Sequence, residues 1–122
     1  MKPEWIIYFV IIEKSNRSRA YGIYLIIKAF TNNEIFNEIT KYLSIPRKKL
    51  GEDVCEEWKK AKLLSEGEGV MLTNEPPDVV YTPSYSFYKF ESEKYEFIII
   101  KIPFSRRLHT PHHLSEMLEK YS

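Results

Sequence analysis

The run WIIYFVII, residues 5–12, constrains the fold more than any other stretch of the chain. Apolar and polar side chains do not alternate in it, and β-branched and aromatic residues dominate. This pattern favours a strand that is buried on both faces, with a short buried helix as the alternative. Residues 97–100, FIII, are also apolar at every position, so they predict a second interior strand. We expect the two strands to lie side by side within one sheet.

A chain of 122 residues is long enough for one domain with its own core, so we expect a single domain over residues 1–122. The net charge of +1 gives no overall basic field, and a nucleic-acid surface would have to be a local patch. The single cysteine, Cys55, excludes an internal disulfide and fits a reducing compartment. Residues 5–12 are too short to span a bilayer and no signal-peptide pattern accompanies them. The expectation is a cytoplasmic protein without a membrane partner.

The middle of the chain predicts three helices in succession. Residues 20–30 carry apolar side chains at helical spacing, namely Ile23, Ile26, Ile27 and Phe30. Thr31 and Glu34 then form a capping-box pattern, which begins a second helix with an apolar face of Ile35, Phe36, Ile39, Tyr42 and Leu43. Pro46 is suited to open a third helix over residues 46–62, with an inward stripe of Leu50, Val54, Trp58 and Ala61.

The second half of the chain predicts mainly strands. The stretch 63–73, with the sequence SEGEG at its centre, indicates a small hairpin. Aromatic and β-branched residues predict strands over 79–81, 85–90 and 95–102, with a turn at 91–94. A last helix is expected from Thr110 and Pro111, with the apolar stripe Leu114, Met117, Leu118 and Tyr121. That stripe would cover the protein's own sheet or form part of a dimer interface.

The order of three helices and a hairpin within residues 20–73 resembles the winged helix-turn-helix superfamily of archaeal and bacterial regulators. Its pieces are the turn Leu43-Ser44-Ile45, the helix 46–62, the pair Leu63-Leu64 that opens the wing, and the pair Leu72-Thr73 that closes it. The resemblance implies an α+β fold with a winged-helix-like three-helix core and a small wing hairpin. Residues 1–19 and 79–122 would add an N-terminal strand, a C-terminal β-hairpin and a terminal helix. A generic α+β domain, with three helices against a sheet, is the alternative.

The resemblance also implies a place for DNA. In a winged helix the third helix enters the major groove, which would put Arg47, Lys48 and Lys49 at the duplex. Cations in the first turn of a helix oppose its dipole, and such a violation of a local preference suggests a functional role. The basic residues that could extend this patch are Lys14, Arg17, Arg19, Arg106 and Arg107. The implied function is a homodimeric transcriptional regulator that binds double-stranded DNA, from an archaeon or its virus.

Acidic residues in the same region favour a second hypothesis. On the predicted third helix, Glu52 and Glu56 face outward, and the tip of the wing carries Glu66 and Glu68. Carboxylates at these positions would repel DNA phosphates. The alternative is therefore a non-enzymatic interaction module that binds a host or partner protein through an acidic, winged-helix-like surface.

Enzymatic chemistry has little support in the sequence. The metal-like cluster is formed by His109, His112, His113 and Glu116, which we interpret as exposed residues at the start of a helix. Cys55 lies among acids, which disfavour a thiolate nucleophile. The glycines match no phosphate-binding spacing. The aromatic residues of 85–97 are interpreted as cross-strand pairs rather than as a platform for bases. We expect no enzyme, no metal site and no cofactor.

Overall fold

The structure, a computed structural model, describes residues 2–45, 52–70, 73–75, 79–81 and 84–104. These residues form two helices and seven strands in an order that begins with a β-hairpin and ends with a β-meander. The elements are β1 (Glu4–Glu13), β2 (Ala20–Lys28), α1 (Asn32–Leu43), α2 (Glu52–Lys60), β3 (Lys62–Val70), β4 (Thr73–Glu75), β5 (Val79–Tyr81), β6 (Ser84–Glu91) and β7 (Tyr95–Pro103).

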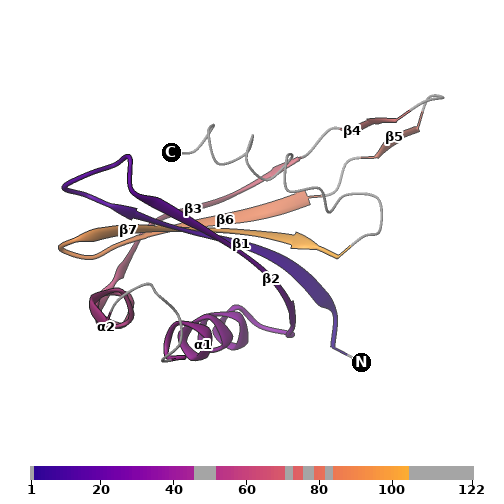
Figure 1. The fold of residues 1–122 in the computed structure, drawn as a ribbon. Helices are drawn as coiled ribbons and strands as arrows, with labels where there is room; N and C mark the ends of the chain where they lie inside the picture. Colours follow the sequence, from indigo (N-terminus) through magenta and orange to yellow (C-terminus); the bar gives the residue numbers. More distant parts are fainter. Residues whose placement is uncertain (1, 46–51, 71–72, 76–78, 82–83, 105–122) are drawn as a thin grey trace.

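Five of these strands form one antiparallel sheet in the order β2-β1-β7-β6-β3 (Figure 1). The first and the last of the described strands, β1 and β7, are neighbours in this sheet. Because β1 and β7 pair in the middle of the sheet, β2 and β3 lie at its two edges. β4 and β5 pair only with each other among the described strands and lie beyond the ends of β3 and β6 (Figure 1).

Both helices cover the same face of the sheet (Figure 1), and alternate residues of the strands point toward them. The core on that face contains Phe9, Phe97 and Ile99 from the sheet with Ile39 and Trp58 from the helices. The opposite face is also buried, because Ile6, Val10, Ile12, Ile98, Ile100 and Ile102 form a second core cluster with Tyr85. Burial on both faces explains why β1 and β7 each contain a continuous apolar run, and the prediction of two neighbouring interior strands is confirmed.

The predicted winged-helix core is wrong. The described residues contain two helices on a five-stranded antiparallel sheet, and the first of the three predicted helices, over residues 20–30, does not exist. That region is β2, which pairs with β1 over nine residue pairs without a register shift. Its alternate residues Ile23 and Ile27 are buried, whereas Ile26 is exposed. A segment that is apolar at nearly every position satisfies both helical and strand spacing, and pairing with β1 decides between them.

The predicted wing hairpin over residues 63–73 is also wrong. β3 runs straight through the two glycines that looked like a turn and pairs with β6 from Lys62 to Val70. The aromatic rings of Phe87 and Tyr85 lie directly across from Gly67 and Gly69. A Cβ atom on Gly67 would lie 2.6 Å from the Phe87 ring, and one on Gly69 would lie closer still to the Tyr85 ring. Glycine here makes room for cross-strand aromatics, which support a strand that glycine alone would weaken.

The helix predicted after Thr31 is confirmed as α1, with the capping box formed by Thr31 and Glu34. The helix predicted over 46–62 is present as α2 from Glu52 to Lys60, and its residues Val54 and Trp58 face inward as expected. Lys62 already belongs to β3. The beginning of that predicted helix, including Leu50, and the helix predicted from Thr110 lie outside the described residues.

Glu34 makes the start of α1 sensitive to acid. A hydrogen bond from the Lys2 ammonium, together with the N–H groups of Phe30 and Thr31, lowers the pKa of Glu34 from 4.5 to about 2. A lowered pKa in the folded state contributes stability above the unfolded pKa, and this contribution is lost as the pH falls from 4.5 to about 2. We expect Glu34→Gln to lower the melting temperature at about pH 6 and to lower it much less at about pH 2. Thermal unfolding at both pH values measures this, and an equal loss at both would contradict the prediction.

Candidate functional site

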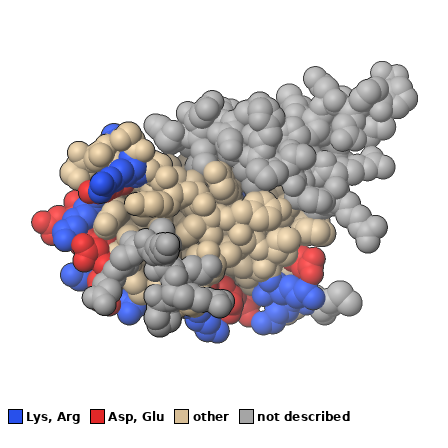
Figure 2. Space-filling view, in the orientation of Figure 1, with Lys and Arg blue, Asp and Glu red and all other residues tan. Residues whose placement is uncertain are grey.

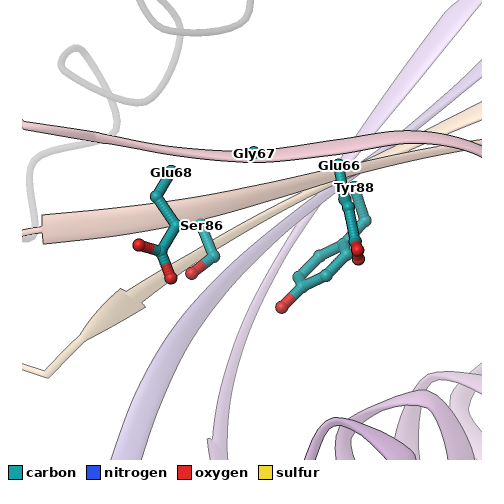
Figure 3. A pocket seen from close by; sticks show the side chains of 5 residues that line it. All are labelled: Glu66, Gly67, Glu68, Ser86 and Tyr88. Carbon is teal, nitrogen blue, oxygen red and sulfur yellow. The ribbon is translucent and has the colours of Figure 1, made fainter.

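A shallow hollow lies on the surface of β3 and β6, on the side of the sheet that carries the helices (Figure 3). It has a volume of about 260 Å³ and is lined by Glu66, Gly67, Glu68, Ser86 and Tyr88. Cross-strand pairing places Glu66 opposite Tyr88 and Glu68 opposite Ser86, so four oxygen-bearing side chains share one face. These are two carboxylates, one hydroxyl and one phenol.

The phenol of Tyr88 is held in place by α1. Its oxygen accepts a hydrogen bond of 2.9 Å from the side-chain amide of Asn32. The carbonyl oxygen of the same amide accepts a bond of 2.8 Å from the ammonium of Lys101. That ammonium also lies 4.5 Å from the centroid of the Trp5 ring, a cation–π geometry. The chain of contacts fixes the first residue of α1 on the sheet, so these polar groups have a structural role.

The chemistry of the hollow is that of a weak acceptor for cations. Glu66 and Glu68 are both exposed, and water screens carboxylates in that position. The lining residues supply no histidine or cysteine that could act as a base, a nucleophile or a soft metal ligand. Charged side chains on an edge strand also prevent it from pairing with another sheet. We interpret the carboxylates as protection of the β3 edge.

The other edge of the sheet has the opposite character. β2 carries no charged residue before Lys28 and no proline, and its sequence AYGIYLIIK is aromatic and β-branched. Tyr21, Tyr24 and Ile26 are exposed by 42%, 38% and 52%. No other strand of the described residues pairs with the outer side of β2. Figure 2 shows a broad area without charge over the region where Figure 1 draws β2, with acids and bases gathered toward the rim.

Two local features keep this edge apolar. Burial raises the pKa of the Tyr24 phenol above its ordinary value of 10.0. A phenol is neutral at physiological pH even at that ordinary value, so Tyr24 adds no charge to the edge. The ammonium of Lys28 lies 3.4 Å from the carboxylate of Glu4 on β1, which balances the charge at the end of the strand. A long, regular and uncharged edge strand is a template for pairing with another chain, and soluble proteins normally block it.

In the same sheet, the edge strand β3 is protected against pairing with another chain. It carries Lys62, Glu66 and Glu68, and its register with β6 shifts between Leu63 and Ser65. Charges and bulges are both devices that prevent edge-to-edge pairing. β2 is equally long, yet it has no bulge and no charge before its last residue, Lys28. The contrast marks β2 as the edge that is open to a partner.

The basic residues proposed to contact DNA are not brought together by the described structure. Arg17 and Arg19 lie in the turn between β1 and β2, and each is paired with an acid. Arg17 contacts Glu96 at 2.7 Å, and Arg19 contacts Glu13 at 3.7 Å. Lys14, in the same turn, contacts Glu91 at 3.2 Å. The remaining residues of the predicted patch, Arg47, Lys48, Lys49, Arg106 and Arg107, lie outside the described residues. DNA binding therefore stays a prediction.

The other candidate groups from the sequence are placed only in part. His109, His112, His113 and Glu116 lie outside the described residues. Within the described residues, no group of three or more His, Cys, Asp or Glu side chains could hold a metal ion. Cys55 is half-buried on α2, and its sulfur lies 3.4 Å from the hydroxyl of Ser44. The helices of the described part of the chain are all too short or too polar to cross a bilayer.

The open edge was missed in the sequence because residues 20–30 were assigned to a helix. One signal could have identified the strand, although not its position at an edge: eight uncharged residues, AYGIYLII, follow a polar loop directly after a predicted strand, which is the pattern of a β-hairpin. The hollow on β3 was missed because Glu66 and Glu68 were assigned to a turn.

Comparisons with protein-family models, with curated proteins and with solved structures find no match, so the function is inferred from the structure alone.

Proposed function

We propose that this chain is a non-enzymatic interaction module that binds an extended segment of a protein at the outer edge of β2. The observation that carries the proposal is the edge itself, which is nine residues long, regular in register and uncharged before Lys28. Backbone hydrogen bonds along such an edge supply affinity, and contacts with alternate side chains supply selectivity. The single cysteine is consistent with action in a reducing, cytoplasmic environment.

The side chains around the edge favour an apolar partner segment. On the face opposite the helices, Tyr24 and Ile26 would meet the alternate residues of an added strand. On the helical face, Tyr21 is exposed beside buried Ile23. A segment rich in β-branched or aromatic residues therefore fits, and one rich in charged residues would lose its hydration without gaining an ion pair.

To test the proposal, a random peptide display library is selected for binding to the protein at low protein concentration. We expect apolar peptides to be enriched and to slow hydrogen exchange of the β2 amides. The double variant Tyr24→Lys and Ile26→Lys should weaken their binding at least about tenfold, because lysine on an edge strand opposes pairing. Leu64→Lys is the matched control, since Leu64 is exposed by 55% on the opposite edge strand β3. Its binding should equal that of the unchanged protein.

Two results would overturn the proposal. The first is a set of peptides that bind the double variant as well as the unchanged protein, or that protect amides outside β2. The second is binding of mixed genomic duplex DNA that weakens with salt and weakens again when Arg47, Lys48 and Lys49 are changed to Glu. That outcome would replace the interaction module by the DNA-binding protein.

A further inference from the structure

We infer that the partner strand at the open edge is β2 of a second copy of this chain, paired antiparallel about a twofold axis at Tyr24. The inference rests on the proposed function, because it names the occupant of the same edge. It would join two five-stranded sheets into one continuous sheet of ten strands. The shared contact would be isologous, with the same residues contributed by both copies.

Tyr24 is the middle residue of β2, so an axis at Tyr24 pairs the strand over its whole length. A strand of this size is about 30 Å long, and full overlap uses every outward backbone group. Residues directly opposite in an antiparallel pair point to the same side of the sheet. The two copies would therefore place their helices on one common face and their second core clusters on the other.

The side chains of β2 are complementary to themselves in this register. Ile26 of one copy would lie opposite Gly22 of the other, and Tyr24 would lie opposite its own equivalent. Gly22 has no Cβ atom, and the place that a Cβ would take is filled by the end of the Tyr8 ring, whose hydroxyl lies 2.7 Å from that position. The exposed Ile26 side chain would thus pack against a glycine backed by an aromatic ring. Pairs of aromatic and β-branched residues are the favourable cross-strand contacts.

The charges at the ends of β2 also permit the pairing. Lys28 of one copy would lie opposite Ala20 of the other, so the two ammonium groups are separated by the length of the strand. Each Lys28 already lies near Glu4 of its own β1. Self-pairing of β3 is disfavoured by its bulge and by the exposed acids Glu66 and Glu68. The two edges of one sheet thus select a closed dimer and not an open polymer.

The test measures the mass and the exchange behaviour of the full chain across a concentration series. Sedimentation equilibrium is expected to give the mass of two chains at high concentration and of one chain on dilution. In the unchanged protein, hydrogen exchange of the β2 amides should slow as the dimer forms, while exchange in β3 should not change. Ile26→Lys should weaken self-association at least about tenfold, and Leu64→Lys should leave it unaltered.

The register is tested by cross-linking in a Cys55→Ser background. Tyr24→Cys at the axis should form an intermolecular disulfide, whereas Ile26→Cys should not, because the two copies of residue 26 would be four residues out of register. A single-chain mass at every concentration overturns the inference, and so does a dimer that Ile26→Lys leaves intact. If the monomer still binds selected peptides at β2, only the identity of the partner fails. If neither peptides nor a second copy protect β2, the proposed function fails as well.

Discussion

Replacing Trp58 by alanine is expected to destabilise the fold by about 3–5 kcal/mol, a large part of the total stability of a small domain. The indole ring of Trp58 lies where α2 meets the sheet. Its centroid is 5.2 Å from the ring of Phe9, 5.2 Å from that of Phe90 and 5.3 Å from that of Phe97. All three contacts have edge-to-face geometry, which contributes beyond the area that is buried.

The polar end of the same ring joins the two helices. The indole N–H donates a hydrogen bond of 2.9 Å to the hydroxyl of Thr40 on α1. That hydroxyl in turn donates to the carbonyl oxygen of Phe36 at 2.8 Å. Trp58 therefore connects α1, α2 and three strands.

Denaturant unfolding of matched variants separates the two contributions. Trp58→Phe keeps an aromatic ring and removes the N–H donor, so it should cost about 1–2 kcal/mol. Trp58→Ala should cost clearly more, with an unchanged dependence on denaturant. If both variants lose the same stability, the ring contacts contribute little and the packing of α2 described above is wrong.

Trp58 also shows which parts of the fold the sequence can predict. Its inward orientation followed from helical spacing with Val54, and the beginning of α1 followed from Thr31 and Glu34. Both depend on contacts within one turn of helix, which local sequence specifies. The interior position of β1 and β7 followed from their lack of alternation, because only burial on two faces accommodates such strands.

The failures depended on distant contacts. Residues 20–30 fitted helical spacing, and only their pairing with β1 shows that Ile26 is exposed while Ile23 is buried. The glycines of β3 looked like a turn because the rings that cover them come from β6, about twenty residues later in the chain. The assignment of residues 20–30 to a helix led to the predicted three-helix core. The interpretation of the β3 glycines as a turn led to the predicted wing.

The open edge could not be predicted from β2 alone. Whether a strand lies at an edge depends on the order of the sheet, and that order is set by β7 returning to pair with β1. Had β7 paired with β2 instead, the apolar residues Tyr24 and Ile26 would lie in the interior. The same sequence would then carry no surface for a partner.

Among neighbouring positions, Ile6 and Ile26 are expected to differ most in the stability that is lost on substitution by alanine. They are Cα partners on β1 and β2 and point to the same face, yet Ile6 is fully buried and Ile26 is exposed by 52%. At low protein concentration, Ile6→Ala should cost about 2–5 kcal/mol, because it leaves a cavity in the second core cluster. Ile26→Ala should cost no more than about 0.5 kcal/mol, as a surface substitution does.

For self-association, the substitution with the larger effect should be Ile26→Ala and not Ile6→Ala. Ile26→Ala removes a side chain from the proposed contact and should weaken the dimer, whereas Ile6→Ala leaves the edge of β2 unchanged. Unfolding is therefore measured below the dimerisation range, since a dimer adds stability by mass action and would hide the difference. Equal costs in the dilute protein would mean that Ile26 is already covered within one chain. The edge would then have no apolar surface left to offer, and both proposals built on it would fall together.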